Sequence, residues 1–203
     1  MSEPRIGRVL VASMHQAITD VLPDRIEFYE NWLSPMGLRE GTIGLAPLSA
    51  VLSFLRLEEA GAYNQITARA GMTWMIRRSS PGRSPTVQSA AYSPARWRAR
   101  AAMRVARTLV SQTYPGSRAI VKFRRGAASV DLRGSLFCEV REASPLPLCG
   151  FYAAAVARVL KHFALPAEVQ VSECRASGTR KACALAVVLQ RPAPDAPDAS
   201  AAA

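Results

Sequence analysis

The clearest prediction of the fold comes from residues 149–189, CGFYAAAVARVLKHFALPAEVQVSECRASGTRKACALAVVL. The segment opens with a long helical stretch that ends at the sequence HFALP. Two short runs with alternating or β-branched residues follow, EVQVSECRA and KACALAVVL, and the turn SGTR joins them. Runs of this kind around a glycine-centred turn are typical of antiparallel strands. The segment therefore predicts one helix laid on a strand hairpin.

The chain before this segment divides into a helical half and a strand-rich part. From Ser117 the runs AIVKF, ASVDL and SLFCEV are short and are separated by RRG and RG, so they predict three antiparallel strands. Before that point apolar residues recur at three- and four-residue steps, which indicates helices. Helices are predicted over residues 5–22, 23–33, 47–59, 63–78 and 94–112, and loops over 37–47 and 79–89. On the last of these helices the predicted buried stripe consists of Trp97, Ala101, Val105 and Leu109.

These elements predict an α+β fold: a helical N-terminal half packed on a small antiparallel sheet, with one long helix across it. A single domain is expected over residues 1–190, and its motif-bearing part is 117–190. The tail 191–203, RPAPDAPDASAAA, holds no large apolar residue and is predicted to be disordered.

Composition indicates a globular chain with a core of its own. Of the 203 residues, 49% are apolar and 20% are charged. Four cysteines are too few for a disulfide scaffold but enough for one metal site. No apolar run approaches the ~20 residues of a membrane span, and the start of the chain lacks a secretory signal pattern. The predicted location is the cytoplasm, where thiols stay reduced.

Charge is distributed unevenly along the chain. The net charge is +11, and no carboxylate occurs between Glu59 and Asp131. Such a field attracts polyanions. Four arginines form a stripe on the helix predicted at 94–112 and are the candidate anion-binding residues: Arg96, Arg100, Arg104 and Arg107. They are suited to a carboxylated ligand, a phosphate or a nucleic-acid backbone, or they form a solvated face. Nucleic acid is the less favoured partner, because no recognised binding motif accompanies them.

Three cysteines are placed to converge. Cys149 opens the long helix, while Cys174 and Cys183 flank the glycine-centred turn of the hairpin. Soft ligands that meet from adjacent elements suit Zn²⁺, which takes four donors in a tetrahedron. The fourth donor is either Glu173 or Cys138, and we select Glu173. The alternative interpretation is that the cysteines are small buried apolar residues.

The residues around these cysteines resemble the 4-vinyl-reductase domain family. CGFYAAAVARVL and ALPAEVQVSECRASGTRKACALAV are similar to the family's pattern of a Cys that opens a helix, a short strand with Glu and Cys, a Gly turn and a closing Cys. The resemblance covers residues 117–190. The family includes bacteriochlorophyll-biosynthesis proteins and sensory domains of phenol-responsive regulators, and its fold is similar to that of the TRAPP vesicle-tethering subunits.

The resemblance implies a site as well as a fold. In the sensor branch three cysteines and a glutamate hold a structural zinc beside a pocket for an aromatic ligand, and the three cysteines match Cys149, Cys174 and Cys183. The family's glutamate corresponds here to Val171, so Glu173 takes that role only after a shift in register. The turn between the last two cysteines is also one residue longer than is usual in the family. Related domains commonly pair, which implies a homodimer.

These observations favour a non-catalytic module that binds a hydrophobic or aromatic small molecule and zinc. No cofactor-binding signature for a reductase is visible, and His15 and His162 are isolated. A bacteriochlorophyll-biosynthesis protein, either a 4-vinyl reductase or a pigment carrier, is the alternative, and a nucleic-acid-binding accessory protein is the second. The candidate ligand-binding residues are aromatic: Trp32, Trp74, Trp97, Phe151 and Tyr152.

Overall fold

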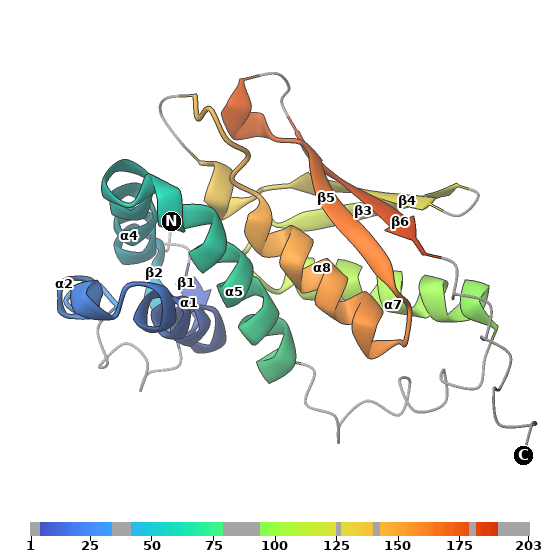
Figure 1. Ribbon diagram of the computed structural model, residues 1–203, viewed down its shortest axis with the longest axis horizontal. Coiled ribbons are helices and arrows are strands. Elements are labelled where there is room, and N and C mark those ends of the chain that lie inside the picture. Colours follow the sequence, from blue (N-terminus) through green and yellow to red (C-terminus); the bar gives the residue numbers. More distant parts are fainter. Residues whose placement is uncertain are drawn as a thin grey trace, which may run out of the picture.

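The computed structural model describes residues 5–33, 42–78, 94–124, 127–139, 143–178 and 182–190. The loop predicted at 79–89 and the tail 191–203 lie outside these residues. Within them, helices gather on one side of the molecule and an antiparallel sheet lies on the other (Figure 1). The prediction of an α+β fold is confirmed.

The N-terminal half is mostly helical. Its elements are β1 (Arg5–Gly7), α1 (Arg8–Val21), the 3-10 helix η1 (Pro23–Arg25), α2 (Ile26–Glu30), β2 (Thr42–Gly44), α4 (Leu45–Glu58), α5 (Ala60–Arg78) and α7 (Ala95–Ser111). The C-terminal half contains β3 (Arg118–Arg124), β4 (Ala127–Arg133), η2 (Leu136–Cys138), α8 (Gly150–His162), β5 (Ala167–Glu173), η3 (Arg175–Ser177) and β6 (Cys183–Leu189).

The main sheet has the strand order β3-β4-β6-β5, and all neighbouring strands are antiparallel. The first and last pairs are the hairpins that the sequence predicts, and β6 pairs with β4 to join them. One irregularity interrupts β5, where the pairing shifts between Val171 and Glu173. The small sheet formed by β1 and β2 was not predicted from the sequence.

The helices are stacked outward from the sheet. Helix α8 packs on β5, α5 packs on α8, and α1 packs on α5, while α7 contacts both β3 and α8 (Figure 1). The closest approach is at Gly71 of α5, where a Cβ atom would lie 2.2 Å from the carbonyl oxygen of Phe151 in α8. A glycine is therefore required for the two helices to cross at this distance.

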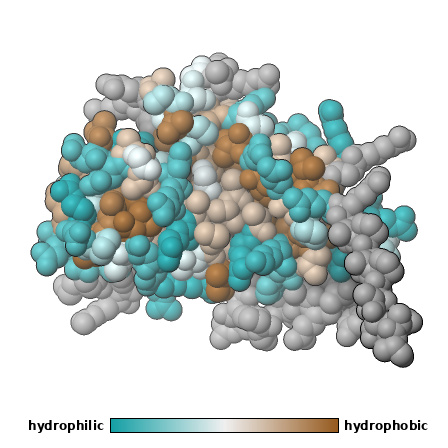
Figure 2. Space-filling view, in the orientation of Figure 1, coloured by the Kyte–Doolittle hydropathy of each residue, from teal (hydrophilic) through white to brown (hydrophobic). Residues whose placement is uncertain are grey.

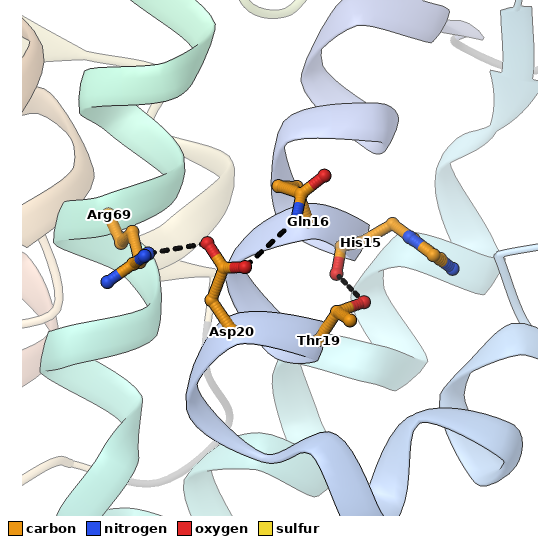
Figure 3. A network of polar contacts seen from close by, with 5 residues as sticks. All are labelled: His15, Gln16, Thr19, Asp20 and Arg69. Atoms are coloured by element: carbon orange, nitrogen blue, oxygen red, sulfur yellow. Dashed lines mark hydrogen bonds and ion pairs between the residues drawn. The ribbon is translucent and has the colours of Figure 1, made fainter.

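A polar network joins α1 to α5 at the surface (Figure 3). Arg69 donates from Nε to Asp20 Oδ2 over 2.6 Å, and Gln16 donates to Asp20 Oδ1 over 2.9 Å. The hydrogen bond from Gln16 and the Arg69 guanidinium hold the pKa of Asp20 below its ordinary value. Thr19 donates to the backbone carbonyl of His15 in the same helix. The network thus adds exposed polar contacts between α1 and α5 to the apolar contacts of the core.

Two predictions of local structure were wrong. The run SLFCEV is not a strand, because Leu136, Phe137 and Cys138 form η2 and all three are buried. A strand would send alternate side chains to opposite faces, whereas this short turn directs three consecutive side chains inward. On α7, Trp97 is 55% exposed, and the buried face consists of three alanines and three larger apolar residues: Ala99, Ala102, Met103, Ala106, Leu109 and Val110.

Candidate metal centre

Four cysteines from four separate elements meet in the interior. Cys138 ends η2, Cys149 precedes α8, Cys174 lies between β5 and η3, and Cys183 begins β6. All four are buried and none forms a disulfide. Their Sγ atoms lie within 4.8 Å of one another. The fold thus brings together three of the predicted metal ligands, and it adds Cys138.

The irregular ends of β5 and β6 explain how two of the thiols reach this point. The register shift after Val171 allows the chain to leave the sheet at Glu173, and Cys174 follows at the start of η3. Gly178 then has φ of 78°, a left-handed conformation that favours glycine. The chain returns to the sheet at Cys183, which pairs with Leu132 of β4.

The separations of the thiols suit a single tetrahedral ion. Cys138 Sγ lies 3.0 Å from Cys149 Sγ and 3.5 Å from Cys174 Sγ and from Cys183 Sγ, and Cys149 Sγ lies 4.0 Å from Cys174 Sγ. A Zn–S bond of ~2.3 Å implies an edge of ~3.8 Å in a regular tetrahedron of sulfurs. The observed values lie on both sides of that edge, so an ion at the centre requires only small side-chain adjustments.

Backbone N–H groups stabilise two of the sulfurs as thiolates. The N–H of Leu148 donates to Cys174 Sγ and the N–H of Arg175 donates to Cys183 Sγ, each over 3.3 Å. Contact with Cys138, contact with Cys149 and these N–H groups lower the pKa of both Cys174 and Cys183. Contact with Cys138 and burial raise the pKa of Cys149. Cysteine binds a metal as the thiolate, so a bound cation would replace protons of these thiols.

Cys138, rather than Glu173, completes the group of four. The carboxylate of Glu173 is not part of this group, although the residue precedes Cys174 directly. Sequence reasoning considered both residues and selected Glu173, the glutamate that a shift in register places in the role implied by the family resemblance. The buried η2 turn is what carries Cys138 inward, and the run of three consecutive buried residues is not visible as a pattern in the sequence.

A hollow of about 370 Å³ opens beside the thiols. Cys138 and Cys183 contribute to its lining, and Arg133 and Arg175 are the charged residues around it. Two of the four sulfur-bearing residues are thus reached from this side.

The five aromatic candidates lie in three different environments. Trp74, Phe151 and Tyr152 are buried next to one another, with ring centroids 5.6 Å apart for Trp74 and Phe151 and 5.4 Å apart for Phe151 and Tyr152. Phe137 stacks on Phe151 at 4.6 Å, so rings fill this part of the interior. Trp32, by contrast, is 41% exposed and contacts Phe54, while Trp97 lies on the exposed side of α7.

The four candidate anion-binding arginines all lie on α7 and are exposed. Three of them, Arg100, Arg104 and Arg107, surround a shallow hollow between α7 and β3, while Arg96 lies outside its lining. The arginine stripe is therefore separate from the buried cysteines.

The fold is shared with H-NOX proteins. An H-NOX protein from K. algicida, a mutant in the unliganded Fe(II) state, matches with a TM-score of 0.59 and 13% identity, over 92% of this chain and 97% of that chain. An H-NOX protein from S. oneidensis in the Fe(II)NO state matches with a TM-score of 0.58 and 10% identity, over 92% of this chain and 100% of that one. At this level of identity the likeness concerns the fold alone.

A TRAPP subunit also appears among the similar structures. Trafficking protein particle complex subunit 3 from Naegleria fowleri, covalently bound to palmitic acid, matches with a TM-score of 0.49 and 13% identity, over 89% of this chain and 96% of that chain. No family model and no curated protein matches the chain.

Proposed function

We propose that this chain is a zinc-stabilised module that binds a hydrophobic or aromatic small molecule. The observation that carries the zinc site is the meeting of four buried Sγ atoms within 4.8 Å. Four thiolates fill all four positions of a tetrahedral zinc, which is typical of structural sites, whereas catalytic zinc keeps one position for water or substrate. The ion would tie η2, α8, η3 and β6 together.

Metal analysis of two matched variants tests this site. We expect one zinc per chain in protein purified without chelator. Cys138→Ser removes a proposed ligand and should reduce the zinc content severalfold, because zinc affinity depends on the full set of thiolates. Glu173→Gln is the matched control and should keep one zinc per chain. Iron in place of zinc, or loss of zinc in the glutamine variant but not the serine variant, would contradict the proposed centre.

The small-molecule site is best supported in a groove between α5, α8 and the start of β5. The groove has a volume of about 590 Å³, and Figure 2 shows pale, weakly hydrophobic surface in the middle of this face of the molecule. Its apolar lining includes Met72, Ala154, Ala157, Leu165 and Pro166, and its charged lining consists of Arg158 and Lys161. Apolar walls with a few charged groups suit an aromatic ligand that carries a carboxylate.

Ligand titrations followed by calorimetry test the groove. Benzoate and phenol are the probes for a simple aromatic ligand, and binding should be lost in Ala157→Phe, where the new ring fills the groove. Ala60→Phe, at an exposed position of α5, is the matched control and should bind as the parent does. If neither probe binds the parent, or if both variants bind equally, this groove is not the ligand site.

A tetrapyrrole is the second candidate ligand, and it would agree with a role in bacteriochlorophyll biosynthesis. The observation that favours it is the pair of cations, Arg158 and Lys161, beside an apolar groove, since carboxylate side chains of a tetrapyrrole pair with such groups. Protoporphyrin IX is the probe, and Lys161→Gln should weaken its binding more than that of phenol.

Neither histidine of the chain is placed to hold a heme iron in the α5–α8 groove. One solved structure with a similar fold concerns heme redox potential and porphyrin distortion. Heme iron needs an axial ligand such as histidine. Here His15 contacts Glu30 over 3.0 Å, and His162 ends α8 outside the lining of the α5–α8 groove.

The homodimer implied by the family resemblance remains a prediction. Exposed apolar side chains on α2, on the turn that follows it and on α4 are consistent with such contact, since Phe28, Trp32 and Leu57 are 42%, 41% and 75% exposed. Sedimentation equilibrium at micromolar concentration measures the oligomeric state directly.

No helix within the described residues is both long and apolar enough to cross a membrane.

A further inference from the structure

A cationic groove runs between α7 and β3, away from the thiols and from the α5–α8 groove. It consists of two adjoining hollows of about 670 and 230 Å³, and Arg107 and Val121 line both of them. Because the two hollows share these residues, they lie next to each other along the surface. Neither of the functions proposed above uses it.

Five arginines line this α7–β3 groove. Arg100, Arg104 and Arg107 follow one another on the same face of α7, about one helical turn apart. Strands β3 and β4 add Arg118 and Arg133. No carboxylate belongs to the lining within the part of the chain that the structure describes. The ion pairs among the described residues involve other basic side chains, so no described carboxylate forms an ion pair with these exposed guanidinium groups.

Aromatic side chains accompany the arginines. Phe123 lines the smaller hollow and is 46% exposed. Trp97 is 55% exposed, and its ring centroid lies 5.8 Å from the guanidinium carbon of Arg100. The faces of exposed aromatic rings are suited to stacking with planar groups such as nucleic-acid bases.

We infer that the α7–β3 groove binds single-stranded nucleic acid, with phosphates on the arginine row and bases stacked on Phe123 and Trp97. The row from Arg100 to Arg107 extends for ~10 Å along the helix, which is more than one small anion occupies. A row of cations beside exposed rings is the combination that binds single strands without sequence preference. Duplex DNA is less suited, because α7 is packed against β3 and does not project into a groove.

Fluorescence anisotropy with a labelled 12-mer of oligouridylate or oligothymidylate in 50 mM salt tests the inference. We expect the parent protein to bind and Arg104→Gln/Arg107→Gln to bind at least tenfold more weakly. The slope of log K against log salt should also become less steep by ~1.4, since each phosphate contact on a single strand contributes ~0.7. Arg8→Gln/Arg77→Gln is the matched control: it removes the same charge from exposed positions outside the groove and should bind nearly as the parent does.

Phe123→Ala separates stacking from charge. It should weaken binding about fivefold or more, because a base–aromatic stack contributes ~1 kcal/mol or more, and it should leave the salt slope unchanged. Melting curves establish that each variant is folded. The inference is overturned if the oligonucleotide does not bind at 50 mM salt, if the control pair weakens binding as much as the groove pair, or if duplex DNA or anionic phosphatidylserine vesicles bind more tightly. None of these outcomes depends on the zinc content or on the aromatic probes.

Discussion

At the scale of single residues, the interior contains polar atoms whose surroundings decide their protonation. Burial raises the pKa of Tyr152 to about 12, from an ordinary value of 10.0. Its hydroxyl lies 3.3 Å from Thr113 Oγ1, which itself donates to the carbonyl of Val110. The phenol is therefore held neutral in the folded protein at pH values where an exposed tyrosine ionises.

Tyr152 should make the protein lose stability in alkali. Below pH 10 the phenol is protonated in both the folded and the unfolded chain, so the contribution of Tyr152 to the free energy of unfolding is fully present. Between pH 10 and about 12 the unfolded chain releases the proton and the folded protein does not, so the free energy of unfolding falls by up to ~1.4 kcal/mol per pH unit. Urea titrations at pH 9, 10.5 and 11.5 measure the decline.

Tyr152→Phe is the matched variant for this decline. It loses one hydrogen bond, at a cost of ~1 kcal/mol near pH 7, and it should show a shallower alkaline decline than the parent. Burial also raises the pKa of Tyr63. Because Tyr63 is present in both proteins, part of the alkaline fall in the free energy of unfolding should remain in the variant. Identical pH profiles for parent and variant would show that Tyr152 ionises normally.

At the scale of elements, the crossing of α5 and α8 determines how closely the helical half approaches the sheet. The carbonyl oxygen of Phe151 occupies the space that a side chain at position 71 would need. Phe151 and Tyr152 of α8 also pack against Phe137 of η2. A shift of α5 away from α8 would therefore disturb the packing next to the cysteines.

Gly71→Ala should be strongly destabilising. The new Cβ would lie 2.2 Å from a backbone oxygen, which cannot move without displacing α8, and overpacking of this kind costs ~3 kcal/mol. Gly61→Ala in the same helix is the control, because nothing lies within 4 Å of its Cβ position. It should be neutral or stabilising by up to ~1 kcal/mol. Denaturant unfolding compares the two variants, and equal stabilities would contradict the close crossing.

The same scale shows where sequence periodicity was informative. The β3–β4 and β5–β6 hairpins and the helices α5 and α8 follow from alternation, three- and four-residue steps and the glycine turns between them. The residues 136–138 were misassigned, because three consecutive apolar residues read as part of a strand when their partners are unknown. Trp97 was wrongly assigned to the buried face, because a large aromatic residue was expected to be buried in preference to alanine. The buried face of α7 includes Ala99, Ala102 and Ala106 instead.

At the scale of the whole molecule, the proposed metal centre connects elements that the sheet alone does not hold. Cys138 and Cys149 lie outside the strands, and they meet two thiols at the ends of β5 and β6. One ion would thereby anchor η2 and the start of α8 to the sheet. Helices α1 and α5 contribute none of the four cysteines, and their buried residues belong to the apolar core.

Removal of the metal should destabilise the protein without unfolding every helix. Chelation under reducing conditions is expected to lower the free energy of unfolding by ~5 kcal/mol and the melting temperature by ~10–20 °C. Calorimetry with and without chelator measures the shift, and added zinc should reverse it. Cys138→Ser serves as the reference, since its melting temperature should be low already and insensitive to chelator. A parent protein that melts unchanged after its metal has been removed would rule out a structural role.

The sequence by itself determined most of the elements, because periodicity predicts helices, and alternation with glycine turns predicts hairpins. It also identified Cys149, Cys174 and Cys183 as candidate soft ligands of a metal. Those features depend on neighbours along the chain, which a sequence records directly. Only the tertiary structure decided that Cys138 joins them, that Glu173 does not, and that Arg118 and Arg133 lie beside the arginines of α7. These contacts join residues far apart in sequence, and their geometry follows from how the helices and the sheet pack.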